Sequence, residues 1–409
     1  MAPSPRDRPV MVLVDAFSTG ALVAREAARR YRLVHVRTRL DMPDAFAASL
    51  PRELFEEDLA YPAEAVARHA PVAVISGSEF GVEAADEMAA RLGLRGNDPA
   101  LSGARRDKAR MMEVLSAAGV RAPRQYRAAG VQDARDWWRR AGLAHVVVKP
   151  VDSAGSEDVY ICGTEEELGA AFGAIIGKRN LMMRPNEAAL VQEYLDGDEY
   201  VVNTVSRDGK HWFTDAWLSR KAVGEGGRKA YDHEDLLPSN HPELARIFPY
   251  VADVLDAVGI KDGPAHSELI LTADGPCLLE TAARVSGLAN PAALDRCTGA
   301  NQVSLTLDCH SPDAAVLTGR PVRYPRLESA RCVNLIARRE VPLPASAFQE
   351  ALLGLPAVES IRFRVPDGGT TRRTVDLNSS PGVVFLVHRD QGEIDRAYKV
   401  LRELEHELL

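Results

Sequence analysis

Apolar and polar positions in the first hundred residues repeat the order strand, helix, strand. The apolar runs "PVMVLVDAF" and "YRLVHVRT" have the length of buried strands, and "ALVAREAARR" between them has helical spacing. "PVAVISGSE" followed by "FGVEAADEMAARLG" repeats the strand and the helix. Buried strands that alternate with helices are typical of a parallel sheet. We therefore expect an N-terminal α/β domain with a parallel sheet.

The middle of the chain changes to separate helices and to strands that alternate between apolar and polar positions. "DKARMMEVLSAAGVRAPR" is helical with a stop at Gly119 and an exit at Pro123, and "VQDARDWWRRAG" and "EEELGAAFGAIIG" are also helical. "HVVVKPVDSAGSEDVYIC" predicts two strands joined by a loop. "ALVQEYLDGDEYVVNTVSRDGKHWFTDAWLSRK" predicts two or three antiparallel strands, and the helical "HPELARIFPYVADVLDAVG" follows.

The last part of the chain mixes helices and strands. A helical stretch follows Arg284, and "RYPRLESARCVNLIA" begins an α+β tail. The tail ends in the strand-like "VVFLVHRD" and the amphipathic "EIDRAYKVLRELEHELL". A chain of 409 residues is long enough for about two to four domains.

The stretch "HSELILTADGPCLLETAARVSG" has the pattern of a hairpin with Glu268 on one strand and Glu280 on the other. A tight turn at "DG" would send the two glutamates to opposite faces. Pro276 disfavours that turn, because the closing residue should donate an N–H that proline lacks. With residues 273–275 as a three-residue loop, 268 pairs with 280, 269 with 279 and 270 with 278. We therefore expect the two glutamates to face each other.

Two facing glutamates need a positive charge between them. Directly opposed side chains have Cβ atoms about 5 Å apart, and two ionised carboxylates there repel by roughly 3 kcal/mol at an effective dielectric of about 20. Oxygen ligands select Mg²⁺ or Mn²⁺, and Mg²⁺ is commonly held by one or two carboxylates with the phosphates of a substrate. Glu268 and Glu280 are therefore candidate metal ligands, and Arg284 is a candidate clamp for a phosphoryl or carboxylate oxygen.

The alternative is structural. One glutamate faces solvent while the other forms a surface ion pair with Arg284, which contributes about 0–1 kcal/mol. The hairpin alone leaves both interpretations open.

A polyphosphate beside such a metal needs cationic partners, and the chain offers Lys108 near a helix start and Lys149 on the strand "HVVVKP". The connection "DSAGSEDV" is short and rich in small residues, so that it can fold over phosphates and donate backbone N–H groups. It is not a Walker loop, because G-x-x-x-x-G-K-[ST] is absent. Alone, Lys149 is more often an ordinary surface lysine, so the order of these features carries the argument.

Composition mainly excludes classes of function. The 50 basic and 58 acidic residues leave a formal charge of −8 without long runs of one sign, which does not indicate nucleic-acid binding. No apolar run reaches the roughly 18–20 residues of a membrane span, and the N-terminus lacks the apolar core of a secretory signal. The five cysteines are widely spaced without C-x-x-C, as in a reduced protein, and we expect most of them in the core. We therefore expect a cytoplasmic protein with neither a nucleic-acid nor a membrane partner.

Taken in order, four stretches resemble the ATP-grasp superfamily over about residues 100–310. They are "RRDKARMMEVLSAAGVRAPR", "VVVKPVDSAGSEDV", "VQEYLDGDEYVV" and "HSELIL…CLLETAARVSG". The ordered set is far more specific than any one member. The resemblance implies an ATP-grasp fold of mixed α/β and α+β class. Its four parts would be an N-terminal α/β domain over 1–100, a subdomain with the lid over 101–190, a subdomain with the metal and substrate site over 191–325, and a C-terminal α+β segment over 326–409.

The resemblance also implies a nucleotide site for ATP. Two lysines would contact the phosphates, the loop 152–158 would cover them, and "QEYL" would be the hinge that holds adenine. The residue that follows this hinge by a few positions, Glu199, would contact the ribose. The residues implied in nucleotide binding are Lys108, Lys149, Ser153, Gly155, Ser156, Glu193, Tyr194, Leu195 and Glu199.

By the same resemblance, Glu268 and Glu280 match the two acids that hold Mg²⁺ or Mn²⁺ on ATP, and Arg284 matches the arginine that steadies the phosphoryl group or the tetrahedral intermediate. Many ATP-grasp enzymes have E-x-N at the second acid, whereas this chain has "ETA", so that an amide ligand for a second ion is missing. "ETAARVSG" after "HSEL" is most similar to the bacterial L-amino acid ligases, the bacilysin-synthetase-like enzymes. That similarity implies substrate contacts for Arg284, Gly287 and His266.

The implied reaction activates a carboxylate with the γ-phosphate of ATP, after which an amine attacks the acyl phosphate. The implied partners are a small carboxylate and an amine, foremost amino acids, and Lys149 and Arg284 would be catalytic by stabilising the phosphoryl group and the oxyanion. We expect the second substrate to meet residues 217–233; a solvated flexible loop is the equal alternative. The glycines and cations of that stretch are Gly224, Gly226, Gly227, Arg220, Lys221, Arg228 and Lys229.

Four other functions stay open: a biotin-carboxylase-like carboxylase, a carboxylate ligase for a nucleotide precursor, a ligase that modifies a protein tail, and an idle ATP-binding module. Both glutamates and Arg284 disfavour the idle module, and the lack of a carrier-like segment disfavours the carboxylase. The sequence leaves the acid, the amine, the number of metal ions and a homodimer open.

Overall fold

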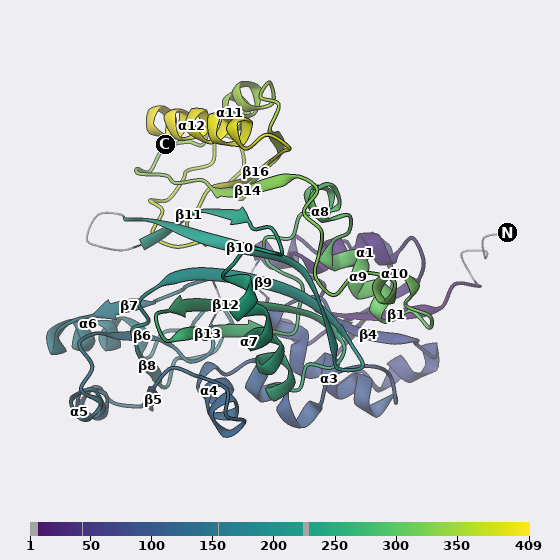
Figure 1. The fold of residues 1–409 in the computed structure, drawn as a ribbon. Helices are drawn as coiled ribbons and strands as arrows, with labels where there is room; N and C mark the ends of the chain where they lie inside the picture. The colour runs from purple at the N-terminus through teal and green to yellow at the C-terminus, as the bar shows by residue number, and fades with distance from the viewer. Residues whose placement is uncertain (1–6, 43, 154, 224–228) are drawn as a thin grey trace.

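The computed structural model describes residues 7–42, 44–153, 155–223 and 229–409 (Figure 1). Within these residues, three sheets form the frame: a parallel sheet of four strands, an antiparallel sheet of four strands, and an antiparallel sheet of eight strands. The mixed α/β architecture expected from the sequence is confirmed.

The parallel sheet lies at the N-terminal end of the chain in the strand order β3-β2-β1-β4. β1 is buried along its whole length, and separate apolar clusters cover the two faces of the sheet. The expected alternation of strands and helices is therefore confirmed. The elements are β1 (Val10–Val14), α1 (Gly20–Ala27), β2 (Arg32–Arg37), α2 (Asp44–Ala47), β3 (Phe55–Ala60), β4 (Ala73–Ser76) and α3 (Val82–Arg91).

The antiparallel sheet of four strands has the order β5-β8-β6-β7. Two helices pack their apolar sides on it, and the first turn of one of them is fixed by a capping box between Thr164 and Glu167. The elements are α4 (Lys108–Ala117), β5 (Gln125–Ala128), α5 (Val131–Ala141), β6 (Val146–Pro150), β7 (Tyr160–Cys162), α6 (Glu165–Ile175) and β8 (Ala189–Glu193).

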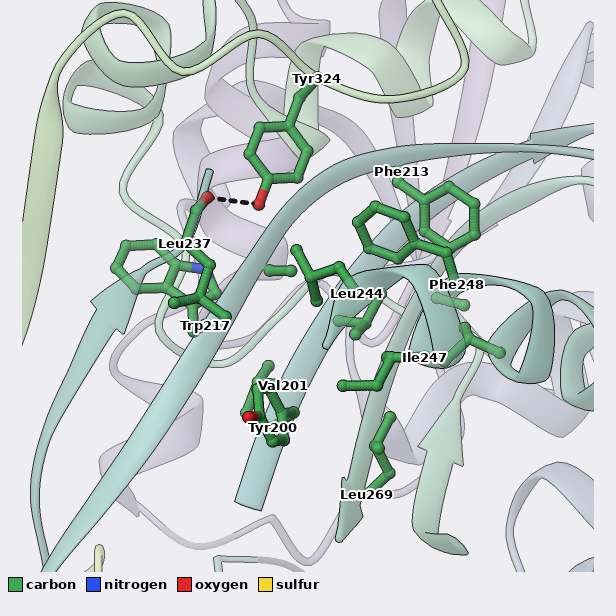
Figure 2. Packing of buried hydrophobic residues seen from close by; sticks show 14 of the residues in the cluster. Tyr200, Val201, Phe213, Trp217, Leu237, Leu244, Ile247, Phe248, Leu269 and Tyr324 are labelled. Carbon is green, nitrogen blue, oxygen red and sulfur yellow. Dashed lines mark hydrogen bonds between the residues drawn. The ribbon is translucent and has the colours of Figure 1, made fainter. Parts of the chain in front are cut away.

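The eight-stranded sheet has the order β13-β12-β9-β10-β11-β14-β16-β15 and contains the glutamate hairpin at one end. Helix α7 (Leu244–Ala257) contributes Ile247 and Phe248 to its main core, where the rings of Phe213 and Phe248 stack 4.1 Å apart (Figure 2). The strands are β9 (Asp198–Arg207), β10 (Lys210–Val223), β11 (Lys229–Leu236), β12 (Gly263–Thr272), β13 (Gly275–Ala282), β14 (Ser329–Asn334), β15 (Val358–Phe363) and β16 (Gly382–His388).

The C-terminal strands continue this sheet and do not form one of their own. β14 pairs with β11, and two helices cover β14, β15 and β16 with a separate apolar cluster (Figure 1). The division at residue 325 proposed from the sequence therefore falls between strands of one sheet. The remaining helices are α8 (Pro291–Thr298), α9 (Gln302–Cys309), α10 (Ala315–Thr318), α11 (Ala345–Leu352) and α12 (Gln391–Leu408).

The hairpin of β12 and β13 differs from the expected register. Glu268 does pair with Glu280, but residue 269 pairs with 278 and 270 with 277. The turn contains two residues, Ala273 and Asp274, and a bulge between 268 and 269 moves the register by one. The expected three-residue loop was wrong, and the glutamates face each other because the bulge compensates for the shorter turn.

Candidate active site

A single pocket with about 180 Å³ of internal space, partly open to solvent, gathers most of the residues singled out in the sequence. It lies where α4, the sheet of β6 and β8, and the strands β9, β12 and β13 meet. Three of the expected residues, His266, Arg284 and Gly287, do not line it. Those that do are Lys108, Lys149, Ser153, Gly155, Ser156, Glu193, Tyr194, Leu195, Glu199, Glu268 and Glu280.

One end of the pocket is apolar, which was not predicted from the sequence. Val159 and Ile161 are 42% and 46% exposed, although both are large aliphatic side chains. The walls supplied by apolar side chains are Val147, Val159, Ile161, Ile270 and Leu279. A slot with such walls suits a flat aromatic base. The signal in the sequence was the pair of β-branched residues in "DVYIC": Ile161 lies on the short edge strand β7, and Val159 directly precedes it.

The pocket also contains two buried lysines. The Lys108 Nζ donates to the Ser153 carbonyl at 2.9 Å and lies 2.5 Å from a carboxylate oxygen of Glu280. The Lys149 Nζ donates to Gln192 Oε1 at 3.0 Å. Burial, and then the neighbouring charge of Lys108, lower the pKa of Lys149 to about 8. For Lys108, burial also opposes the charged form, but Glu280 outweighs it, so the pKa of Lys108 is raised.

The facing glutamates each have a different basic partner. Glu280 pairs with Lys108, while Glu268 accepts a hydrogen bond at 3.1 Å from Nε2 of His266. Nδ1 of the same ring lies 2.8 Å from Asn203 Oδ1. Although burial opposes ionisation, the hydrogen bond and charge of His266 lower the pKa of Glu268 to about 2. The positive charge expected beside the glutamates is thus supplied by side chains of the protein, and His266 holds Glu268.

The loop after Lys149 reaches over the pocket with an unusual backbone. Gly155, Ser156 and Asp158 all have positive φ angles, and Ala154 lies outside the described residues. The Ser153 hydroxyl donates to Glu157, whose carboxylate also accepts the Leu181 N–H at 2.8 Å. From the C-terminal segment, the Asn378 amide donates to the Gly155 carbonyl at 3.3 Å.

The expected ribose contact already has protein partners. Glu199 is buried and accepts hydrogen bonds from Lys221 Nζ at 2.5 Å and from the Tyr231 hydroxyl at 2.8 Å. At the hinge, the Glu193 carboxylate accepts from Nε of Arg124 at 2.7 Å.

The expected loop at 217–233 is largely strand. Residues 217–223 belong to β10, and β11 begins at residue 229, so much of this stretch is strand. Arg220 pairs with Asp198 at the surface, and Lys221 faces the pocket. Gly224, Gly226, Gly227 and Arg228 lie outside the described residues, as does the side chain of Lys229.

Arg284 is held by a residue from the N-terminal domain. Its Nε donates to Glu79 at 2.6 Å, and Glu79 also pairs with the buried Arg106. Arg106 pairs in turn with Asp152 at 2.8 Å, at the start of the loop over the pocket, and Arg184 pairs with Asp152 at 2.7 Å. Although burial opposes ionisation, Arg106 and Arg284 lower the pKa of Glu79 to about 2. We refer to Arg284, Glu79, Arg106, Asp152 and Arg184 as the ion-pair chain. Gly287 is exposed a few residues beyond it.

Comparisons with known proteins agree with this fold and pocket. A family model described as an ATP-grasp domain matches residues 143–292. Dapdiamide A synthase of Enterobacter agglomerans is 30% identical over 413 aligned residues, which cover 98% of this chain and 96% of that protein.

Two solved structures support the fold. The L-amino acid ligase of Bacillus licheniformis matches with a TM-score of 0.73 at 17% identity, over 97% of both chains. The carboxyaminoimidazole ribonucleotide synthase of Aspergillus clavatus, in complex with ATP, matches with a TM-score of 0.71 at 12% identity, over 98% of this chain and 99% of that one.

The pocket between two sheets is that of an ATP-binding enzyme, and the chain belongs to the ATP-grasp superfamily. It is an ATP-grasp ligase of the amide-forming type. Among the described helices, none is both long and apolar enough to cross a membrane.

Proposed function

We propose that this ligase joins the carboxylate of one amino acid to the amine of a second, and converts ATP to ADP and phosphate. The observation that carries the proposal is the similarity to dapdiamide A synthase over nearly the whole length of both proteins. The pocket supports it, because buried lysines and paired glutamates lie together at one end of an apolar slot.

Adenine would occupy the apolar end, between Ile161 and Leu279, next to the hinge residues 193–195. The ribose would then lie at Glu199, and the phosphates would reach Lys108 and Lys149. The loop with Ser153, Gly155 and Ser156 would cover the phosphates with its N–H groups. The pocket thus offers apolar walls for the base, a carboxylate for the sugar and cations for the phosphates.

Mg²⁺ or Mn²⁺ fits between Glu268 and Glu280, because the two carboxylates face each other and each already takes a basic partner. Among the described residues, no group of three or more His, Cys, Asp or Glu side chains could hold a metal, so the phosphates of ATP would complete the shell. The ion would neutralise charge on the phosphate oxygens. Lys108 would give up its contact with one carboxylate oxygen of Glu280, and His266 its contact with one carboxylate oxygen of Glu268.

The chemistry follows in two displacements. A carboxylate oxygen of the first amino acid attacks the γ-phosphorus, the bond to the bridging oxygen breaks, and ADP leaves with the electron pair. The amine of the second amino acid then attacks the acyl carbon, the bond to the phosphate oxygen breaks, phosphate leaves, and the nitrogen loses a proton to solvent. Lys149 and Arg284 would stabilise the charge on the phosphoryl oxygens and on the tetrahedral oxyanion.

Arg284 and Gly287 are the proposed contacts of the substrate carboxylate. Arg284 lies beyond Glu280 at the end of β13, and the exposed backbone of Gly287 lies in the same loop. His266 acts on the substrate through Glu268, because both of its ring nitrogens have protein partners. We further propose that the enzyme works in the cytoplasm, where its five buried cysteines stay reduced.

The mass of the product tests the proposal. The protein is incubated with ATP, Mg²⁺ and pooled L-amino acids, with and without bicarbonate, and the products are separated by mass. Release of ADP with a dipeptide mass is the expected result. Release of ADP that needs bicarbonate, or that occurs without any amino acid, would contradict it.

A further inference from the structure

The C-terminal segment of the chain contacts the loop over the ATP pocket. The side-chain amide of Asn378 donates a hydrogen bond to the Gly155 carbonyl at 3.3 Å, although 223 positions separate the two residues in the sequence. Gly155 and Ser156 line the pocket, whereas Asn378 does not. Asn378 therefore touches the loop from outside the pocket.

The turn that carries Asn378 is fixed by its own hydrogen bonds. The Ser379 hydroxyl oxygen accepts from the Asp376 N–H at 3.0 Å, and the Asp376 carboxylate accepts from the Ser379 N–H at 2.8 Å. Arg364, just beyond the end of β15, donates to the Leu377 carbonyl at 2.9 Å. The amide of Asn378 is thus presented by a backbone that is attached to the C-terminal strands.

The close approach of Asn378 depends on the glycine at position 155. Gly155 has a φ angle of +67°, which favours glycine, and a Cβ there would lie 2.7 Å from Nδ2 and 2.8 Å from Oδ1 of Asn378. A methyl group at this position would therefore displace the Asn378 amide from the carbonyl. The contact requires both residues.

The two ends of the same loop are held by other parts of the protein. At its beginning, Lys108 Nζ donates to the Ser153 carbonyl at 2.9 Å. Near its end, the Glu157 carboxylate accepts from the Leu181 N–H at 2.8 Å. Asn378 adds a contact at Gly155, in the middle of the loop, from the other end of the chain.

The peptide unit between Gly155 and Ser156 gives this contact a direction. The Gly155 carbonyl and the Ser156 N–H belong to one trans peptide, so they point in opposite directions. Because the carbonyl is turned toward Asn378, outside the pocket, the Ser156 N–H is turned away from the C-terminal turn. Among the residues that the structure describes, none accepts a hydrogen bond from this N–H.

We propose that Asn378 is a positioning residue for the phosphates of ATP. It holds the Gly155 carbonyl and so aims the Ser156 N–H at a phosphate oxygen. The consecutive positive φ angles of Gly155 and Ser156, +67° and +60°, belong to a turn whose successive N–H groups can form a concave site for an anion. A hydrogen bond to the carbonyl also polarises the peptide and makes its N–H a stronger donor. The inference rests on the proposed position of the phosphates under this loop.

Asn378→Ala tests the proposal. Calorimetry measures the binding of a non-hydrolysable ATP analogue with Mg²⁺, without any amino acid. The Kd of the variant is expected to rise about 2- to 10-fold, which is the range for one hydrogen bond between neutral groups. A rise of less than about twofold would overturn the proposal.

Val375→Ala is the matched control, because Val375 borders the same turn with a side chain that is 38% exposed and cannot form a hydrogen bond. Its Kd should equal that of the wild type. Without nucleotide, all three proteins should unfold at the same temperature, and the analogue should stabilise Asn378→Ala less than the other two. If Asn378→Ala unfolds earlier without nucleotide but gains as much stability from the analogue as the wild type, its role is structural and the proposal fails.

A double-mutant cycle locates the effect at Gly155. Gly155→Ala by itself displaces the Asn378 amide, so adding Asn378→Ala should then change the Kd by less than about twofold. An equal loss of affinity from Asn378→Ala with glycine and with alanine at position 155 would show that Asn378 acts elsewhere, and would overturn the proposal.

The binding measurements need no turnover, so they separate this inference from the proposed function. If Asn378→Ala weakens the binding of the analogue but the wild type forms no dipeptide, the positioning role stands and the amino acid ligase proposal fails. If the wild type forms a dipeptide but Asn378→Ala binds the analogue as tightly as the wild type does, the ligase proposal stands and the positioning role fails.

Discussion

At the scale of the residue, the charged side chains of the pocket are paired with one another. Lys108 pairs with Glu280 at 2.5 Å, and His266 pairs with Glu268 at 3.1 Å. In the proposed mode of ATP and metal binding, Lys108 would exchange a carboxylate for a phosphate oxygen. The pair therefore keeps the buried charges compensated before the nucleotide arrives.

Glu280→Gln is expected to lower kcat for ADP release by at least about 100-fold, because the proposed metal ligand loses its negative charge and one of its carboxylate oxygens. ADP release with the amino acid substrate present measures the effect, and circular dichroism checks the fold. Asp274→Asn is the control, since Asp274 lies in the turn of the same hairpin with a side chain that is 88% exposed. Full activity of Glu280→Gln would remove the metal assignment.

The affinity for ATP is expected to fall as the pH rises above about 8. Burial and Lys108 lower the pKa of Lys149 to about 8, so in the free enzyme this lysine becomes neutral within the usual assay range. Phosphates favour the charged form of Lys149. Above that pH, Lys149 must therefore take up a proton when ATP binds, which raises the Kd by up to about tenfold per pH unit. Nucleotide Kd values between about pH 7 and pH 9.5 measure this.

Lys149→Met provides the comparison for that experiment. The variant should bind ATP more weakly at neutral pH, and its Kd should not rise as the pH passes about 8. A wild-type Kd that is constant across this range, or a rise that persists in the variant, would show that another group is responsible.

At the scale of the element, the connection between the two antiparallel sheets depends on one glycine. Gly197 lies between β8 and β9 with φ of +154°, and a Cβ there would be 2.2 Å from the Leu271 carbonyl oxygen. This close approach keeps the hinge against β12. The hinge residues of the pocket immediately precede it.

Gly197→Ala is expected to destabilise the protein by about 1–3 kcal/mol, because the backbone is strained and the new methyl group clashes with backbone that cannot move easily. Gly173→Ala is the control of opposite sign: Gly173 lies inside α6 with open space around it, and alanine there should stabilise by about 0.5–1 kcal/mol. The denaturant concentrations at the unfolding midpoints of both variants, compared with that of the wild type, measure these changes in stability. Equal midpoints would show that the close approach to Leu271 does not exclude a methyl group.

Elements with a strong pattern could be predicted from the sequence, and elements defined by long-range pairing could not. β1 is an unbroken apolar run and α3 and α12 have clear helical periods, and each appears where expected. β3 was missed because its sequence "FEEDLA" is largely polar and only partly buried. The bulge beside Glu268 also has no local signal, since it adjusts the hairpin to β9 and to the turn at the same time.

The residues of the candidate site also fall into those that the sequence predicts and those that it does not. Lys149 and the two glutamates were found because they lie in ordered motifs along the chain. Glu79 and Asn378 were missed, because nothing near them in the sequence shows that the first meets Arg284 or that the second meets Gly155. Such contacts depend on the register of strands and the docking of domains.

At the scale of the whole molecule, the ion-pair chain connects three parts of the protein. Glu79 comes from the N-terminal domain, Asp152 from the loop over the ATP pocket, and Arg284 from the end of β13. Arg106, which is largely buried, lies between the first two. The position of the loop and the position of Arg284 are therefore mechanically linked.

Glu79→Gln is expected to raise the KM for the acid substrate and to lower kcat by about tenfold, since Arg284 loses the charge that orients it. Glu79→Asp should restore part of the activity. Steady-state kinetics for both variants give the separate constants. A uniform loss of stability without any change in KM would favour a purely structural role for Glu79.

The eight-stranded sheet has a consequence for attempts to make a smaller enzyme. A version that ends before Ser329 would lose β14 and turn the inner strand β11 into an unprotected border with unpaired N–H and C=O groups. Self-association through that border would follow. The last eighty or so residues thus cover an edge of the sheet that carries the candidate active site.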